Sequence, residues 1–470
     1  MTKQLNRRDF IKTTGAASAG MLLGVPGFSI TKKQKNMPVT IENVDSDFER
    51  EPLIRPFGFK GGYMTEIWQT VAQMQSDAGH SKIGLCTQNV LWSDAKVFAG
   101  HSESGGNTLM YTLTERALQM IKGMKFENPI QLQEEILEDV YAYGKSITKE
   151  PDLRKTFALN ALVGLDNAAW LLYAAKNGIR NFDDMIPEKY KPALSHKHDK
   201  VASIPLMAYS IPIEEIEEAA EQGYFFMKIK IGQPGTQKEM LEKDKERLTA
   251  IHKAIGHMRT RYTKDGNLPY YFDANGRYES KEMLKKLLDH AKKIGAFDQI
   301  AIIEEPFPEE LETHVDDLPV RIAADESLHG EEDAVKRIQM GYSAFALKAI
   351  AKTLSMTLKQ AQLAYENNVP CFMADLTVNP ILVEWNKAVA ARLKSFPEMG
   401  ELGLLETNGH QNYKNWDTMV SYHPYPDASW RKTKEGVFNL NEDYYSKSGG
   451  IFDESQHYEE MFRHMPSEKD

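Results

Sequence analysis

The second half of the chain alternates short apolar runs with longer stretches in which apolar residues recur every three or four positions. Short apolar runs predict buried strands, and the longer periodic stretches predict amphipathic helices. The predicted strands are Ile204–Ser210, Tyr224–Ile231, Tyr270–Asp273, Ile300–Glu304, Val320–Asp325, Phe345–Ile350, Cys371–Leu376 and Leu402–Glu406. The predicted helices are Ile213–Gln222, Lys238–Ile255, Lys281–Ile294, Glu331–Met340, Ser355–Asn367 and Pro380–Leu393. Strands joined in this way by helices predict a parallel α/β barrel of the TIM type.

Two connections bear on this prediction. An open doubly wound sheet would more typically have a glycine-rich loop after its first strand, and Tyr209–Pro212 has no glycine. The fourth connection, Phe307–Pro319, has little helical character, so one crossover is expected to be a loop. Neither feature argues against the barrel.

The residues before about position 200 predict a separate α+β region. Val39–Val44 predicts a strand, and helices are predicted near 112–122, 129–146 and 158–175. Gly100–Gly106 is predicted to be a glycine-rich loop, either a mobile cover over a site or a plain surface connection. After Thr407 an aromatic tail is predicted to pack back on this first region.

The N-terminus is similar to a twin-arginine export signal. Arg7 and Arg8 are followed by Phe10, and a weakly hydrophobic stretch rich in alanine and glycine runs from Thr13 to Val25. The apolar run is too short for a comfortable membrane span. Because Ala17–Ala19 is a poor cleavage site, an uncleaved signal that anchors the protein stays open, as does a plain basic tail. We expect export to the periplasm with the twin-arginine machinery as a partner.

The composition excludes some other classes. A formal net charge of −10 leaves no basic patch for nucleic acid. The two cysteines, Cys86 and Cys371, make neither a disulfide framework nor a zinc site. Stability must therefore come from packing.

Charged residues stand where several of the predicted strands end. Lys228 and Lys230 lie two positions apart on one strand, so both side chains point to the same face. Mutual repulsion and burial are expected to lower the pKa values of these lysines toward neutrality, which suits a general base. Alone, such a pair is more often a solvated strand edge.

Asp273, Glu304 and Asp325 end three consecutive predicted strands. The carboxyl ends of barrel strands meet at one face, and oxygen ligands from separate strands suit Mg²⁺. Strand parity predicts that the neighbouring Glu305 and Glu326 face away from this site.

Lys348 lies on the sixth predicted strand, which is across a barrel from the second. Lys230 and Lys348 are therefore expected to flank a metal-bound substrate. The chemistry this implies is removal of a proton from the carbon beside a carboxylate, with a divalent cation stabilising the developing charge.

These motifs together resemble the enolase superfamily, in the muconate-lactonizing-enzyme and dipeptide-epimerase-like branch of the mandelate racemase/muconate lactonizing enzyme family. The quoted motifs are Lys-x-Lys, Asp-x-Asn, Glu-Glu-Pro, Asp-Glu-Ser and the lysine of strand six. The resemblance implies Lys230 and Lys348 as the two acid/base residues, and Lys228 as a contact of the substrate carboxylate that also tunes Lys230. It implies Asp273, Glu304 and Asp325 as Mg²⁺ ligands, with Asn275 as an auxiliary polar residue.

The resemblance also implies a modified (β/α)7β barrel with an N-terminal α+β capping domain. We expect a signal and linker in residues 1–36, the cap in 37–200, the barrel in 201–408, and a C-terminal segment that packs on the cap in 409–470. A homo-oligomer is expected.

Strand eight departs from the family pattern. Dipeptide epimerases of this branch carry an Asp-x-Asp pair there that holds the substrate amine, whereas this chain has Glu406-Thr407-Asn408. Glu406 is expected to bind an amine alone, or to hydrogen-bond the enolate when protonated. His410 and Asp375 are weaker candidates.

The leading hypothesis is a Mg²⁺-dependent racemase or epimerase acting beside a carboxylate, with an N-acyl amino acid or a dipeptide such as L-Ala-D/L-Glu as substrate. A muconate-type cycloisomerase or an acid dehydratase starts from the same enolate and stays open. A catalytically idle exported binding protein is a third hypothesis.

Overall fold

The computed structural model describes residues 36–59 and 62–463 of the chain. The chain divides into two compact units, Met1–Asn36 and Met37–Asp470, and the account below concerns the second. The predicted export signal lies outside the described residues.

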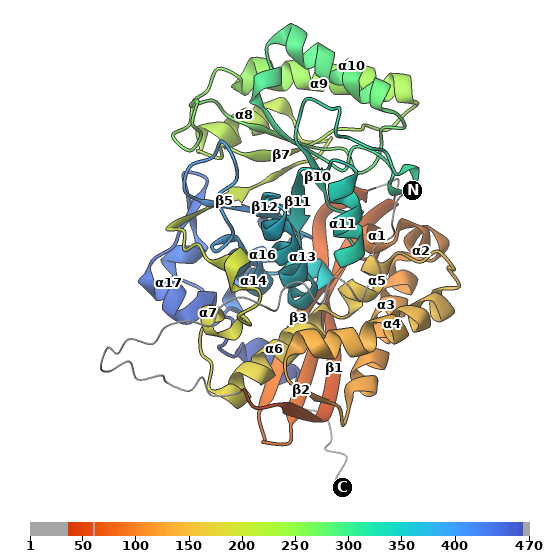
Figure 1. The fold of residues 1–470 in the computed structure, drawn as a ribbon, viewed down its shortest axis with the longest axis vertical. Coiled ribbons are helices and arrows are strands. Elements are labelled where there is room, and N and C mark those ends of the chain that lie inside the picture. The colour runs from red at the N-terminus through yellow and green to blue at the C-terminus, as the bar shows by residue number, and fades with distance from the viewer. Residues whose placement is uncertain (1–35, 60–61, 464–470) are drawn as a thin grey trace, which may run out of the picture. The chain divides into compact units, whose positions relative to one another are not determined.

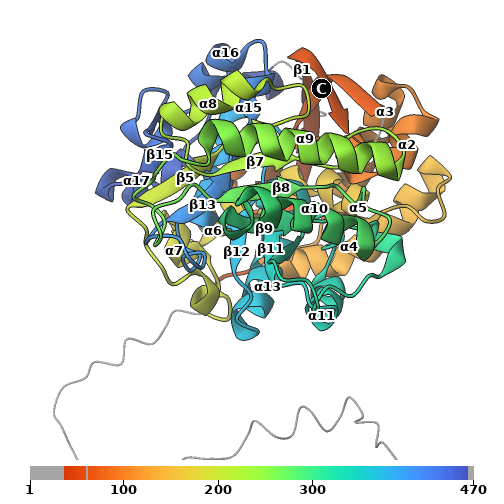
Figure 2. The ribbon, with the colours of Figure 1, turned by 90° about the horizontal axis from the view of Figure 1, so that it is seen from above.

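The larger sheet is an α/β barrel in which neighbouring barrel strands pair in parallel. Its strands are β5 Lys200–Ile204, β6 Leu206–Met207, β7 Met227–Lys230, β8 Tyr270–Asp273, β9 Ile300–Glu304, β10 Ile322–Ala324, β11 Ala344–Leu347, β12 Cys371–Met373 and β13 Gly403–Glu406. The helices that join them are α8 Ile213–Glu221, α9 Gln237–Ile255, α10 Lys281–Ile294, α11 Glu331–Gln339, α12 Ala349–Lys352, α13 Leu354–Glu366 and α14 Pro380–Ala390. The connection between β9 and β10 holds only the short 3₁₀ helix Glu309–Leu311. Figure 1 and Figure 2 both show α9 and α10 side by side outside the sheet.

The first strand closes the barrel in two pieces. β5 pairs with β13, and β6 pairs with β7. Pro205 stands between the pieces, has no N–H to donate, and accepts a hydrogen bond from the Lys228 N–H through its carbonyl oxygen at 3.0 Å. The predicted strand Ile204–Ser210 was therefore displaced toward the C-terminus, because most of the paired residues precede the proline.

The outer helices form for local reasons. α10 buries Leu284, Leu287, Leu288 and Ala291, which share one helical face, and leaves its charged residues outside. The Ser280 side chain accepts a hydrogen bond from the Met283 N–H at the start of α10, and Gly295 ends it in the left-handed conformation.

The N-terminal region contains an antiparallel sheet in the order β3-β2-β1-β4. Its strands are β1 Val39–Phe59, β2 Gly62–Ser76, β3 Ser81–Gln88 and β4 Lys125–Phe126. Its helices include α1 Val90–Ser93, α2 Ala95–Gly100, α3 Glu103–Ile121, α4 Pro129–Thr148, α5 Lys155–Ala161, α6 Val163–Asn177 and α7 Phe182–Met185. We call the region from β1 to α6 the cap.

Two predictions for the cap were wrong in part. Glu103–Gly106 belongs to α3, because the Ser102 hydroxyl accepts the Gly105 N–H at 3.0 Å and starts a helix that tolerates the two glycines. The helix predicted over 158–175 is broken between α5 and α6. Within residues 36–59 and 62–463, no single helix has the length and apolar character of a membrane span, and α5 with α6 passes only as a pair bent by 47°.

The cap is joined to the barrel by buried polar contacts. Asp166 of α6 accepts hydrogen bonds from the Ser355 N–H at 3.1 Å and hydroxyl at 2.5 Å, at the start of α13. Arg154 donates to the Glu326 carbonyl oxygen at 2.8 Å and pairs with Glu309 at 2.8 Å. The cap therefore contacts the loop that follows β10.

The C-terminal segment contacts both regions. β15 Val437–Asn439 pairs with β5 and also with β14 Thr433–Lys434. Tyr413 accepts a hydrogen bond from Gln69 of β2 at 2.8 Å and donates to the Thr377 carbonyl oxygen at 2.5 Å. His457 of α18 Gln456–Phe462 contacts Glu49 of β1 at 2.7 Å.

Candidate active site

Lys228 and Lys230 point together into the barrel mouth, as strand parity predicts. The Lys228 ammonium lies 2.9 Å from Glu304 and 3.0 Å from Asp273. The Lys230 ammonium donates to Asp273 and Asn275, both at 2.6 Å. The two lysines therefore share one carboxylate, and both are buried.

The predicted lowering of the lysine pKa is wrong for Lys228. Burial by itself lowers this pKa, but Asp273, Glu304 and Glu406 together raise it well above its ordinary value. The pKa of Lys348 is also raised, because the charge of Asp325 outweighs the effect of burial. The prediction considered only burial and the repulsion between the two lysines. It did not include the attraction of the carboxylates that the barrel places beside them.

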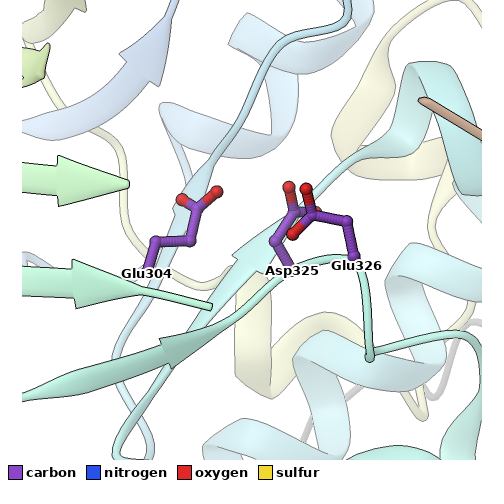
Figure 3. A group of neighbouring side chains, drawn as sticks. All are labelled: Glu304, Asp325 and Glu326. Atoms are coloured by element: carbon purple, nitrogen blue, oxygen red, sulfur yellow. The ribbon is translucent and has the colours of Figure 1, made fainter. Parts of the chain in front are cut away.

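Glu304, Asp325 and Glu326 form a buried carboxylate cluster, in which one oxygen of each lies within 4.8 Å of the others. Figure 3 shows their three carboxylates directed toward a common space. The expectation that Glu326 faces away is wrong. β10 ends at Ala324, so Asp325 and Glu326 belong to a turn to which strand parity does not apply.

Asp273 lies beside this cluster with a different set of partners. Lys228 and Lys230 outweigh the effect of its burial and lower its pKa. Burial and the charge of Asp273 raise the Glu304 pKa, whereas Lys348 and Lys352 hold that of Asp325 at about 2 despite its burial. One Glu326 oxygen, Oε2, is buried without a hydrogen-bond partner among the described residues. Three buried carboxylates with an unmatched oxygen fit a hard divalent cation such as Mg²⁺.

Glu305 supports the turn from behind. Its carboxylate accepts hydrogen bonds from the Asp325 N–H at 2.8 Å and the Ser327 hydroxyl at 3.0 Å. Burial and the nearby Glu326 raise its pKa to about 7. Glu305 thus supports the turn that carries Asp325 and Glu326.

Lys348 and Lys352 both contact Asp325. The Lys348 ammonium lies 2.5 Å from Asp325 Oδ2, and that of Lys352 donates to the Asp325 carbonyl oxygen at 2.5 Å. Lys352 is buried, which lowers its pKa. The sequence analysis missed Lys352, although its position one helical turn after Lys348 is a signal that could have found it.

A third group of polar residues lines the remaining wall. Glu406 accepts hydrogen bonds from Lys228 at 3.2 Å and from the Asp375 N–H at 3.0 Å. Asn408 donates to Glu406 at 3.1 Å, and its own side-chain oxygen is buried without a partner among the described residues. Burial and Glu406 raise the Asp375 pKa to about 7. His410 is not among the residues of this wall, and its ring packs against Trp416.

Most of these groups line one small pocket with a cavity of about 40 Å³, whereas Glu304, Glu305 and Lys352 lie behind its lining. The barrel side contributes Lys228, Lys230, Asp273, Asn275, Asp325, Glu326, Lys348, Asp375, Glu406 and Asn408. The cap contributes Phe57, Phe59, Met64, Asn89 and Trp92, none of which the sequence analysis identified. No local pattern marks these cap residues, because only the packing of the cap on the barrel brings them to the site.

Tyr271 contacts the cluster from within the barrel. It is fully buried, and its hydroxyl donates to Glu304. Tyr271→Phe is expected to weaken Mg²⁺ binding by about 10- to 100-fold, since groups that orient a metal ligand have effects of this size. Titration calorimetry measures the Mg²⁺ affinity of each protein. Tyr270→Phe is the matched control, because the neighbouring hydroxyl contacts His252 on the other side of the strand at 2.9 Å. Equal Mg²⁺ affinity in the wild type and Tyr271→Phe would contradict this role.

Comparison with known proteins identifies the barrel. Residues 213–421 match the family model described as enolase C-terminal domain-like. The barrel is an enolase-superfamily domain. Residues 4–24 match the twin-arginine translocation pathway signal sequence, which confirms the predicted signal. No curated protein matches the chain.

Solved structures of the superfamily have the same fold. A dipeptide epimerase from Cytophaga hutchinsonii, complexed with Mg and D-Ala-L-Val, is 16% identical with a TM-score of 0.59, covering 87% of this chain and 98% of its own. An N-succinyl Arg/Lys racemase from Bacillus cereus is 15% identical with a TM-score of 0.58, covering 80% and 89%. A mandelate racemase/muconate lactonizing protein from Herpetosiphon aurantiacus is 15% identical with a TM-score of 0.58, covering 86% and 97%. The predicted fold, a TIM-type barrel with an N-terminal α+β cap, is confirmed.

Proposed function

We propose that the protein is a Mg²⁺-dependent racemase or epimerase that exchanges the proton on the carbon beside a carboxylate. The observation that supports this most is the placement of Lys230 at the end of β7 and Lys348 directly after β11, four strands apart in an eight-stranded barrel. Both lysines line one pocket, and carboxylates from intervening strands lie between them. A planar enolate held there would have one lysine on each face.

Glu304 and Asp325 are proposed as ligands of the cation, together with Asp273 as the resemblance implies or Glu326 as the cluster suggests. When bound, Mg²⁺ would stabilise the negative charge that develops on the substrate carboxylate. It would also offset the carboxylate charge that raises the Lys348 pKa, and so favour a neutral Lys348 as base.

The proposed proton transfers use only side chains of the pocket. Lys230 removes the α-proton from one face, and Lys348 delivers a proton to the other. The reverse reaction exchanges their roles. Lys228, held by Glu304 and Glu406, would contact the substrate carboxylate and fix the plane of the enolate.

A dipeptide or N-acyl amino acid is the substrate class we propose, as two of the compared enzymes have such ligands or substrates in their names. A ligand of this size needs a cavity of about 300 Å³ or more, so the 40 Å³ pocket must open for it to enter. Asp375, Glu406 and the unmatched oxygen of Asn408 are all acceptors and would suit a substrate ammonium group.

Glu406→Gln should weaken binding of a dipeptide with a free amino group by about 10- to 100-fold, the size expected for losing a charged hydrogen bond. Binding of the same dipeptide with an acetylated amine should change much less.

Because Asp375 has a pKa of about 7, it gains its negative charge as the pH rises through 7. Affinity for the free amine should therefore rise from pH 6 to about 7.5, above which the dipeptide amine loses its own charge. Calorimetry on wild type, Glu406→Gln and the exposed control Glu401→Gln measures both effects, and equal losses for both dipeptides would contradict an amine site.

Deuterium exchange tests the proposed function. The protein is incubated in D₂O with Mg²⁺ and a panel of dipeptides and N-acyl amino acids, and α-proton loss is followed by NMR. We expect exchange with inversion for at least one compound. Ring opening or loss of water in place of inversion would favour the cycloisomerase or dehydratase, and binding without chemistry would favour the idle binding protein.

We further propose that the twin-arginine signal takes the folded protein, with its cation already bound, to the periplasm. An uncleaved signal would leave it anchored to the membrane. Immunoblotting of soluble and membrane fractions distinguishes the two outcomes.

A further inference from the structure

Trp92 is a cap residue whose backbone is fixed at the pocket. It lies in α1, and the Asn89 side chain accepts a hydrogen bond from the Trp92 N–H at 3.0 Å. The Asn89 N–H in turn donates to Asn160 of α5 at 2.9 Å. Because Asn160 is fully buried, this chain of contacts ties Trp92 to the interior of the cap.

The indole ring lies over one of the two proposed bases. Lys348 Nζ is 4.4 Å from the ring centroid, and Lys352 Nζ is 5.6 Å away. A cation this close to an indole face is attracted to it. The Lys348 ammonium is therefore contacted both by Trp92 of the cap and by Asp325 of the barrel.

The indole N–H is the unusual feature. Nε1 is buried and has no hydrogen-bond partner among the described residues, although Trp92 lines the pocket. The other buried tryptophans of the cap, Trp68 and Trp170, donate to Glu66 at 3.0 Å and to Ser355 at 3.1 Å. A buried donor without a partner is costly, so an acceptor supplied by a ligand would relieve the cost.

We propose that Trp92 is a substrate-binding residue, whose indole N–H donates to a neutral acyl oxygen of the substrate while its ring positions Lys348. This inference rests on the proposed function. The lysines and the cation would take the substrate carboxylate, and the wall of Asp375 and Glu406 would take an ammonium group. The remaining polar atoms of a dipeptide backbone are the amide N–H and the amide carbonyl oxygen. Of these, the oxygen requires a neutral donor, which Trp92 provides.

Fluorine NMR tests the contact without relying on catalysis. The protein is labelled with 5-fluorotryptophan, and the Trp92 signal among the six tryptophans is assigned from Trp92→Phe. With Mg²⁺ present, the panel of dipeptides and N-acyl amino acids is added, followed by the alkene isostere of each binder, in which a neutral trans double bond replaces the amide and so removes the acyl oxygen without adding a charge. We expect the Trp92 signal to shift with the acyl compound and to shift little with its alkene isostere.

The matched variants are Trp92→Phe, which keeps a ring over Lys348 but lacks the N–H, and Trp68→Phe, which changes a cap tryptophan outside the pocket. Trp92→Phe should weaken binding of the acyl compound at least tenfold and raise KM by a similar factor, with kcat within about threefold. Trp68→Phe should change the binding affinity, KM and kcat each by less than twofold.

An unshifted Trp92 signal at saturation, equal binding by Trp92→Phe, or no binding by any acyl compound overturns the inference. If the α-proton exchanges but the Trp92 fluorine signal does not shift, the proposed function stands and this contact is ruled out. Binding that depends on Trp92 without any α-proton exchange would support this contact and contradict the proposed function.

Discussion

Lys348→Ala should abolish racemisation and still exchange the α-proton of one enantiomer with solvent. Each lysine reaches one face of the enolate, so the remaining Lys230 can remove and return a proton only on its own side. We expect interconversion of enantiomers to fall by about 10²- to 10⁴-fold, the range of effects seen when an acid/base group is lost. Exchange of the enantiomer served by Lys230 should persist. Proton NMR in D₂O, run separately on each pure enantiomer, measures both rates.

The complementary variants make the prediction specific. Lys230→Ala should retain exchange only for the other enantiomer. Lys228→Ala should slow exchange of both, because the Lys228 charge contacts Glu304, Asp273 and Glu406 and would act on both faces alike. Normal racemisation by Lys348→Ala would rule out Lys348 as the second base and show that another group delivers the proton to that face.

Glu304→Gln and Asp325→Asn should each weaken Mg²⁺ binding by more than about 100-fold, beyond the effect of losing a supporting residue, and should abolish turnover. Each change replaces a charged ligand by a neutral amide in a buried cluster. Asp273→Asn and Glu326→Gln then decide which acid completes the ligand set. The variant that loses Mg²⁺ affinity identifies the third ligand, whereas loss of turnover with normal Mg²⁺ affinity indicates a role in holding the lysines.

Titration calorimetry with Mg²⁺ measures all four affinities. Asp317→Asn is the control for the carboxylate-to-amide change, because Asp317 is an exposed acid paired with Lys281 and Lys285. Full Mg²⁺ dependence and rate in both Glu304→Gln and Asp325→Asn would place the cation elsewhere.

The barrel could be predicted where local signals agree with the tertiary fold. β8 and β9 have the bounds predicted for them, since each is a short apolar run that ends in one acid. α10 also has its predicted bounds, with a serine cap before it and a glycine after it. The placement of the strand ends at one face of a barrel then brought Lys228, Lys230, Asp273, Glu304, Asp325 and Lys348 into one site.

The remaining parts of the site depend on contacts distant in sequence. Glu326 enters the cluster because β10 stops one residue before Asp325, which a run of apolar residues does not reveal. The raised pKa of Lys228 depends on three carboxylates from other strands. Trp92 reaches Lys348 only through the packing of the cap on the barrel. In the cap itself, the long hairpin of β1 and β2 was missed beyond Val44, because charged residues interrupt its apolar alternation.

The most direct test of the central claim follows where solvent deuterium appears during one early time course. A single enantiomer of the best compound in the panel is incubated in D₂O with the wild-type protein and Mg²⁺, and the two enantiomers are separated before racemisation exceeds about a tenth. With two bases on opposite faces, the inverted product should carry deuterium at the α-carbon while most of the recovered starting enantiomer still carries hydrogen. Absence of α-deuterium in both enantiomers of every carboxylate tested, despite bound Mg²⁺, would contradict the account.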